Sequence, residues 1–185
     1  MIPVVKRNQA EEIRFALGRS SVGRVLVASS DKGVVAISVG EDPDELVDEL
    51  LRLFPAAHVV SGDRQDRDLV NRVAAYIENP RSELDLPLDL RGTAFQRKVW
   101  RAVREIPFGT TSTYAEVARK IGAPRAMRAV GSACANCRLA FVIPCHRVLR
   151  SDGSCSAGRE RQQFLIDRER AAEAKAPQKF RRDDG

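Results

Sequence analysis

The chain has 185 residues, of which 43% are hydrophobic and 30% are charged. This length allows one domain or two small ones, and the hydrophobic share indicates a packed core, which excludes a fully disordered chain. Lys and Arg number 31 against 25 Asp and Glu, a formal net charge of +6. Such an excess suits a polyanionic partner, although ordinary soluble proteins also carry it.

No apolar run approaches the roughly 20 residues of a membrane-spanning helix, and the first residues lack the apolar region of a signal peptide. We therefore expect a cytoplasmic protein without a membrane partner. All four cysteines lie between Cys134 and Cys155. A secreted disulfide framework would spread its cysteines along the chain, so this cluster indicates metal binding, a reactive thiol or core packing.

The first half of the chain predicts a small mixed domain. Residues 23–28 and 33–39 are β-branched runs that predict a hairpin, and residues 14–17 predict a third strand. Asp42 is a predicted N-cap for a helix that Pro55 ends. A second helix is expected over residues 66–79, and its predicted buried side consists of Leu69, Val73, Tyr76 and Ile77. His58 is expected in a loop, as an ordinary surface residue.

The rest of the chain predicts a linker and then helices. Residues 84–90 alternate around Pro87, which predicts an extended segment lying across the surface. Thr93 is expected to cap a helix that carries Phe95, Val99, Val103 and Ile106. The expected domains are residues 1–84 and 85–170, followed by a disordered tail over residues 171–185.

Two helices joined by a short turn predict a helix-turn-helix. Thr113 and Glu116 fit a capping box, and Gly122 with Pro124 marks the turn. The second helix is expected over residues 125–134. Its predicted inward face consists of Ala126, Met127, Val130, Ala133 and Cys134, and its predicted outward face consists of Arg125, Arg128, Ala129 and Ser132. This small, basic outward face lacks base-reading side chains, so it favours sequence-independent DNA binding or a merely solvated surface.

Cys145 is a candidate nucleophile because it follows the apolar run over residues 139–143 and precedes His146. Burial raises the pKa of a thiol, so reactivity requires a neighbouring base. His146 needs a local turn or a bridging water to act as that base, and Glu169 is a candidate carboxylate to orient it. A core cysteine beside a chance histidine is the alternative interpretation. Tyr114 as core packing and Glu169 in a surface salt bridge are also open alternatives.

The sequence IPCHRV over residues 143–148 resembles the signature of the O6-alkylguanine-DNA alkyltransferases. Residues 91–96, 107–114 and 128–130 resemble the same family at matching spacing, most closely the C-terminal part of the bacterial adaptive-response protein. The resemblance implies an α/β (α+β) fold, in which a small ribonuclease-H-like domain precedes an all-helical domain with the helix-turn-helix.

The resemblance also implies roles for individual residues. Cys145 would accept the alkyl group of O6-alkylguanine, or of O4-alkylthymine, from a base flipped out of duplex DNA. His146, Glu169 and Tyr114 would assist this single-turnover reaction without a cofactor or metal, and the protein would act as a monomer without an obligate protein partner. Substrate and DNA contacts are implied for Arg128, which fills the gap left by the flipped base, and for Arg125, Ala129, Ser132, Thr113, Asn136, Ser156 and Arg147.

Two features depart from the family pattern. Cys137 occupies the position of a family asparagine, and Asn136 lies one residue early. The loop over residues 154–159 is about three residues shorter than in relatives and lacks their aromatic residues, which predicts a more open base pocket. The rival functions are a damaged-DNA sensor without transfer, a DNA–protein crosslinking activity, a transcription factor, and a zinc site built from the four cysteines.

Overall fold

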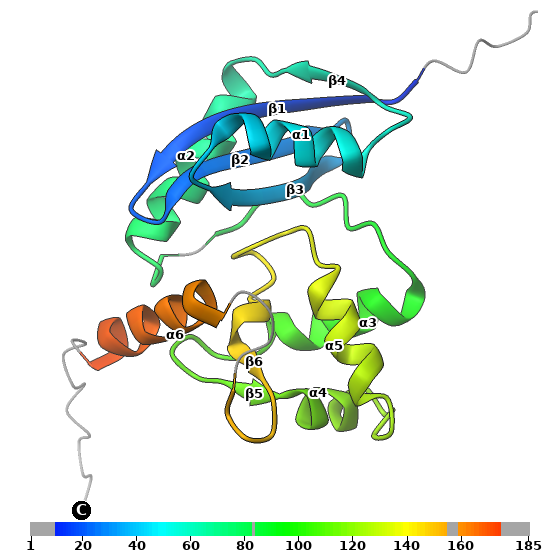
Figure 1. Cartoon of the computed structure of the whole chain (residues 1–185), viewed down its shortest axis with the longest axis vertical. Helices are drawn as coiled ribbons and strands as arrows, with labels where there is room; N and C mark the ends of the chain where they lie inside the picture. The colour runs from blue at the N-terminus through cyan, green and yellow to red at the C-terminus, as the bar shows by residue number, and fades with distance from the viewer. Residues whose placement is uncertain (1–9, 83, 155–158, 175–185) are drawn as a thin grey trace, which may run out of the picture. The chain divides into compact units, whose positions relative to one another are not determined.

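The computed structural model describes residues 10–82, 84–154 and 159–174, and the chain forms two compact units (Figure 1). The first unit runs to Gly92 and includes Arg138–Val142, and the second contains Thr93–Cys137 and continues from Ile143. The boundary therefore lies eight residues beyond the predicted one at residue 84. The reason is hydrogen bonding: Val34 donates to the Pro87 carbonyl at 2.8 Å, and Asp89 donates to the Val34 carbonyl at 2.9 Å.

The first unit contains a four-stranded sheet in the order β3-β2-β1-β4. Its strands are β1 (Glu12–Ser20), β2 (Gly23–Ser30), β3 (Gly33–Gly40) and β4 (His58–Ser61). The predicted hairpin and third strand are confirmed as the antiparallel β1, β2 and β3, whereas β4 pairs in parallel with β1. His58 is exposed as predicted, but it begins a strand rather than lying in a loop.

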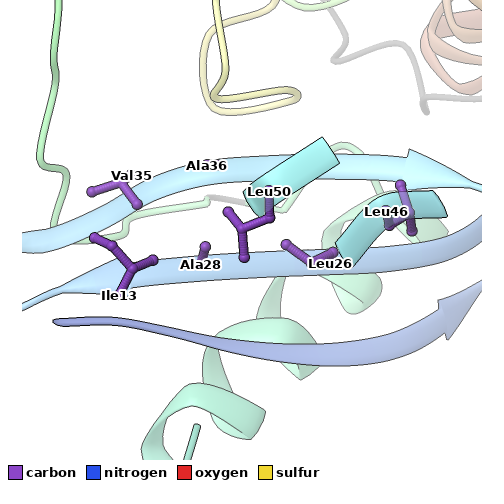
Figure 2. Close-up of a cluster of buried hydrophobic side chains, with 7 residues drawn as sticks. All are labelled: Ile13, Leu26, Ala28, Val35, Ala36, Leu46 and Leu50. Carbon is purple, nitrogen blue, oxygen red and sulfur yellow. The ribbon is translucent and has the colours of Figure 1, made fainter. Parts of the chain in front are cut away.

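Two helices, α1 (Pro43–Leu53) and α2 (Arg64–Glu78), cover opposite faces of this sheet (Figure 1). Asp42 caps α1 as predicted, accepting a hydrogen bond from the Asp44 amide at 2.8 Å. Leu46 and Leu50 of α1 pack on one face of the sheet (Figure 2) in a cluster with Ile13, Leu26, Ala28, Val35 and Ala36. This cluster is the core beneath α1.

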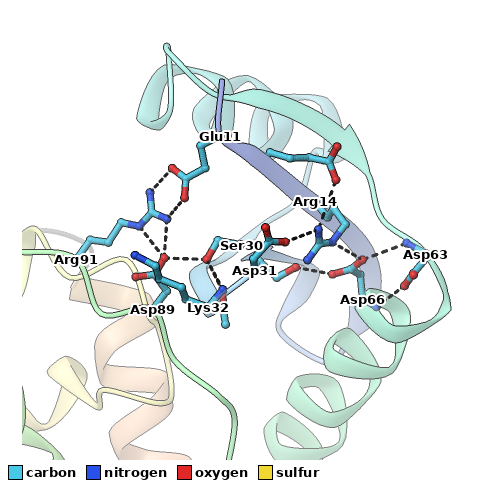
Figure 3. Close-up of polar contacts among 12 residues, drawn as sticks. Glu11, Arg14, Ser30, Asp31, Lys32, Asp63, Asp66, Asp89 and Arg91 are labelled. Carbon is cyan, nitrogen blue, oxygen red and sulfur yellow. Dashed lines mark hydrogen bonds and ion pairs between the residues drawn. The ribbon is translucent and has the colours of Figure 1, made fainter. Parts of the chain in front are cut away.

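The α2 helix begins two residues earlier than predicted because Asp63 and Asp66 form a capping box. Its buried residues are Asp66, Val70, Val73 and Ile77, so the predicted burial of Leu69 and Tyr76 is wrong, as both are half-buried. Buried Asp66 accepts a hydrogen bond from Ser29 and lies 3.6 Å from Arg14 Nε (Figure 3). The same figure shows Arg91 joining Glu11 and Asp89 by ion pairs.

The second unit consists mainly of helices: α3 (Ala94–Arg104), α4 (Tyr114–Lys120), α5 (Met127–Ala135), the 3₁₀ helix η1 (Cys145–Arg147) and α6 (Arg159–Ala174). It is not all-helical as expected, because β5 (Ser112–Thr113) and β6 (Val148–Leu149) form a short parallel pair. Thr93 and Thr113 cap α3 and α4 through capping boxes, as predicted. The expected disorder from residue 171 is wrong up to Ala174, which is the last residue of α6.

The helix-turn-helix is formed by α4 and α5, with Gly122 in the turn at a φ of 74°. Helix α5 begins at Met127 rather than at residue 125, and Met127 is 45% exposed, so its predicted inward position is wrong. The indole of the single tryptophan, Trp100, donates to the Ala133 carbonyl at 2.8 Å and joins α3 to α5. None of the helices described is long and apolar enough to cross a membrane.

Candidate active site

Cys145 is held by a short turn at the end of a buried segment. Leu139, Phe141, Val142 and Ile143 are buried as predicted. Pro144 follows, and its carbonyl accepts a hydrogen bond from the Arg147 amide at 2.9 Å. The resulting 3₁₀ turn is the local turn that the sequence offered as an alternative to a bridging water, and consecutive side chains no longer alternate here as they do in a strand.

The thiol of Cys145 contacts two further thiols, those of Cys134 and Cys137 at the C-terminal end of α5. Hydrogen bonds with these two side chains, followed by burial, raise the pKa of the Cys145 thiol well above its usual range. The resting nucleophile is therefore a protonated thiol. A reaction at this sulfur needs a base that removes the proton.

Glu169 of α6 is the centre of a buried polar cluster that also contains His146 and Arg147. Its carboxylate lies 2.7 Å from His146 Nε2 and accepts hydrogen bonds from Arg147 Nε at 2.8 Å and from the Gly109 amide at 3.2 Å. Glu169 is only 4% exposed, so the alternative of a surface salt bridge is wrong. The predicted pairing of this carboxylate with His146 is present in the structure.

The electrostatics of this cluster favour an ionised carboxylate. Burial by itself would raise the pKa of Glu169, but the hydrogen bonds and charges of His146 and Arg147 outweigh it and lower the pKa to about 2. Glu169 is consequently a fixed negative charge beside the imidazole. A carboxylate in this position fixes the orientation of the ring and stabilises its protonated form.

Arg147 is the main correction to the predicted site. We expected it to contact DNA, but it is 6% exposed, and its guanidinium binds Glu169 and the Ile106 carbonyl, the latter at 2.8 Å. The guanidinium also lies over the Phe108 ring, 5.7 Å from its centroid. Because these contacts lie within the protein, the Arg147 guanidinium binds other protein groups and not DNA.

Gln162 of α6 is a site residue that the sequence interpretation missed. Its side-chain amide donates to the carbonyls of His146 and Val148, both at 3.0 Å, and the residue is 9% exposed. Gln162 thereby anchors the turn that carries Cys145 to the last helix. The only signal in the sequence is a glutamine at the spacing of two helical turns from Glu169, which does not identify its carbonyl partners.

The other expected DNA contacts divide into exposed residues and capping residues. Arg125, Arg128, Ala129 and Ser132 are exposed as predicted. Thr113 accepts a hydrogen bond from the Glu116 amide at 3.2 Å, and Asn136 Nδ2 donates to the Ser132 carbonyl at 2.8 Å. Tyr114 is half-buried against Gly131, and the expected contact residue Ser156 lies outside the described residues.

The zinc alternative relied on four cysteines. Within residues 10–82, 84–154 and 159–174, no three His, Cys, Asp or Glu side chains are arranged to hold a metal ion. Cys155 falls outside those ranges.

Comparison with known protein families matches both units. Residues 13–90 match the ribonuclease-like domain of 6-O-methylguanine DNA methyltransferase, and residues 94–171 match the DNA-binding domain of the same protein. The expected order of a ribonuclease-like domain followed by a DNA-binding domain is thereby confirmed.

Individual relatives agree with this match. The chain is 46% identical over 160 residues to the bifunctional transcriptional activator/DNA repair enzyme Ada of Escherichia coli, which covers 85% of the chain but only 45% of Ada. It is 34% identical to the inducible methylated-DNA–protein-cysteine methyltransferase of Bacillus subtilis, over 79% of the chain and 84% of that protein.

Solved structures give the same result. The crystal structure of the O6-methylguanine methyltransferase of Mycobacterium tuberculosis has a TM-score of 0.72 and 30% identity, covering 90% of this chain and 96% of that one. A second structure from that organism, a complex with DNA, has a TM-score of 0.69 and 31% identity, covering 87% and 94%. With both domains matched, and with the B. subtilis relative covered over 84% of its length, the chain belongs to the 6-O-methylguanine DNA methyltransferase family.

Proposed function

We propose that this protein repairs O6-alkylguanine in duplex DNA by transferring the alkyl group to its own Cys145, once per molecule. A thiol placed one residue before a histidine that binds a buried carboxylate is the observation that carries the proposal. The repair function of the relatives supports it, since the B. subtilis protein is named for transfer to a protein cysteine. O4-alkylthymine is a second candidate substrate.

The reaction is a single displacement at the alkyl carbon. The S–C bond to Cys145 forms as the C–O6 bond breaks, and the electron pair of that bond stays with the guanine. The thiol proton leaves through His146, and the departing guanine takes up a proton. Tyr114 is proposed to donate a hydrogen bond to the guanine as negative charge develops on it. The products are a thioether and unmodified guanine, so neither a cofactor nor a metal is required. Because the thioether is stable, each protein molecule acts once.

Because the pKa of Cys145 is raised, its thiol proton has to be removed for transfer to occur. We propose that His146 removes it, through a water molecule, while Glu169 holds the ring and stabilises the imidazolium. Arg147 and Gln162 are proposed as positioning residues, because one binds Glu169 and the other binds the backbone of the turn. Neither is proposed to touch the substrate.

The exposed face of α5 is proposed to bind DNA. Arg125 and Arg128 provide positive charge, and the small side chains of Ala129 and Ser132 allow the backbone to approach the groove closely. Arg128 is proposed to enter the stack in place of the flipped nucleotide. Thr113, Asn136 and Ser156 are proposed as further contacts near the base and its flanking phosphates.

We also propose that the protein is a cytoplasmic monomer. Three thiols in contact would be oxidised in an oxidising compartment, which supports the cytoplasmic part of the proposal. Light scattering after size-exclusion chromatography tests the monomer, with a dimer as the contradicting result.

The experiment that tests the proposed function measures repair stoichiometry on duplexes carrying O6-methylguanine. Increasing amounts of duplex are incubated with the full chain, and restored guanine is counted alongside the intact protein mass. We expect repair to stop at one guanine per protein, with the mass of one methyl group gained, and we expect Cys145→Ser to repair none. Binding of the damaged duplex without any mass gain would instead identify a sensor, and a DNA-sized adduct would identify a crosslinking protein.

The short loop over residues 154–159 gives a second prediction about the substrate. If the base pocket is more open than in relatives, single-turnover rates will fall less, or rise, on going from a methyl to a benzyl adduct. The comparison uses the B. subtilis relative as its reference. The same ratio of benzyl to methyl rates in both proteins would contradict an open pocket.

A further inference from the structure

The thiol cluster formed by Cys134, Cys137 and Cys145 contains two sulfurs that transfer does not use. Cys134 and Cys137 lie in one turn at the end of α5, where the Cys137 amide donates to the Cys134 carbonyl at 3.1 Å. Both side chains are in hydrogen-bonding contact with the Cys145 thiol, and all three residues are thiols rather than disulfides. The Cys145 sulfur is therefore in contact with two other thiols.

The two neighbours differ in their freedom to react. Cys134 belongs to the last turn of α5 and is 9% exposed, packed on the inner face of the helix. Cys137 follows the C-cap residue Asn136, lies outside the helix and is half-buried. A disulfide needs two α-carbons roughly 4.4 to 6.8 Å apart and a specific dihedral angle. Backbone beyond a helix end adjusts to that geometry more readily than a packed helical turn.

We propose that Cys137 is a resolving thiol for Cys145, so that hydrogen peroxide converts this pair into a reversible disulfide. Cys145 sulfur first attacks the O–O bond of the peroxide, which gives a sulfenic acid and water. The Cys137 sulfur then attacks the sulfenic sulfur, the S–S bond forms, and a second water leaves. The two thiols have lost two protons and two electrons, and the peroxide has received both to become two waters.

The disulfide has two consequences for Cys145, and the first rests on the proposed function. The sulfur bonded to Cys137 cannot attack an alkyl carbon, so oxidised protein does not repair DNA. A second consequence is protection, because a disulfide is reduced by an external dithiol, whereas sulfinic and sulfonic acids are not. The high pKa of Cys145 keeps its thiolate scarce, so the oxidation is expected to be faster at mildly alkaline pH than at neutral pH.

The test treats the full chain with hydrogen peroxide at mildly alkaline pH in a Cys155→Ser background, which removes the only other cysteine. Remaining thiols are alkylated, and peptides are mapped without reduction. We expect a linked peptide pair joining Cys137 to Cys145, loss of two hydrogens from the intact mass, and full recovery with dithiothreitol. Trp100 fluorescence confirms that each variant is folded.

Two substitutions identify which cysteine forms the disulfide with Cys145. In Cys137→Ser the link is expected to disappear and Cys145 to accumulate as sulfinic acid, whereas Cys134→Ala is expected to retain the link. A link from Cys134 to either other cysteine, or equal sulfinic acid with and without Cys137, would overturn the proposal. These mass readouts need no DNA. Repair by the reduced protein is measured separately, so failure of the proposed function cannot be confused with failure of the disulfide.

Discussion

Replacing Glu169 with glutamine removes the negative charge at the centre of the buried cluster while keeping the shape of the side chain. The carboxylate participates in four hydrogen bonds, with His146 Nε2, Arg147 Nε and Nη2, and the Gly109 amide. The Arg147 guanidinium would remain buried without its counter-ion. Removing one partner of a buried ion pair typically costs about 3–5 kcal/mol.

The lowered pKa of Glu169 gives a second, independent value for this loss of stability. A fall from 4.5 to about 2 corresponds to roughly 3 kcal/mol of stabilisation by the ionised carboxylate at neutral pH. Because the native pKa is the lower one, the unfolded chain binds the proton first as the pH falls. The stabilisation is therefore complete above pH 4.5 and declines toward pH 2, and at about pH 3 roughly 2 kcal/mol of it has been lost.

The assay is urea unfolding followed by fluorescence of Trp100, which is buried in the same unit as Glu169. We expect Glu169→Gln to be less stable than the parent by about 3 kcal/mol at pH 7, and the difference to shrink steadily below pH 4.5. Asp167→Asn is the matched control, because Asp167 lies on the same helix but is exposed. An unchanged difference between pH 6 and about pH 3, or a stable variant at pH 7, would refute this reasoning.

Three further substitutions test the fold. Gly33→Ala is expected to lower stability by about 1–3 kcal/mol, because Gly33 has a φ of 138° and a Cβ there would lie 2.5 Å from the Pro87 carbonyl oxygen. A thermal melt followed by circular dichroism measures this loss, and an unchanged melting temperature would contradict the prediction. Leu50→Ala removes a side chain that is 1% exposed in the core under α1 and should cost about 2–5 kcal/mol in the same melt. Thr113→Ala removes the N-cap of α4 and should cost about 1 kcal/mol in urea unfolding. Thr113→Ser should retain that stability, and equal losses for both substitutions would argue against capping as the cause.

Local signals in the sequence predicted most elements whose ends are set by local chemistry. Asp42, Thr93 and Thr113 cap the helices they were predicted to cap, because a cap depends only on the three or four residues that follow it. The strand His58–Ser61 was missed because it is four residues long and is stabilised by parallel pairing with β1, more than 40 positions earlier in the chain. Such pairing leaves no local pattern.

The candidate site shows the same division between local and distant information. The sequence identified Cys145 and His146, and it named Glu169 as the carboxylate, because a motif and a resemblance cover them. The family resemblance assigned Arg147 to the DNA contacts, but its side chain is buried. Its burial depends on Glu169, 22 positions later. Met127 was predicted inward from helical periodicity, but it is the first residue of α5 and is exposed.

The central claim is that one sulfur, that of Cys145, receives the alkyl group. The most direct measurement uses a duplex whose O6-methyl group carries deuterium, followed by peptide mapping of the repaired protein. We predict that the labelled methyl group is found on Cys145 alone, in every molecule that has repaired a base. Label on Cys134 or Cys137, or repaired guanine without any label on the protein, would contradict the account.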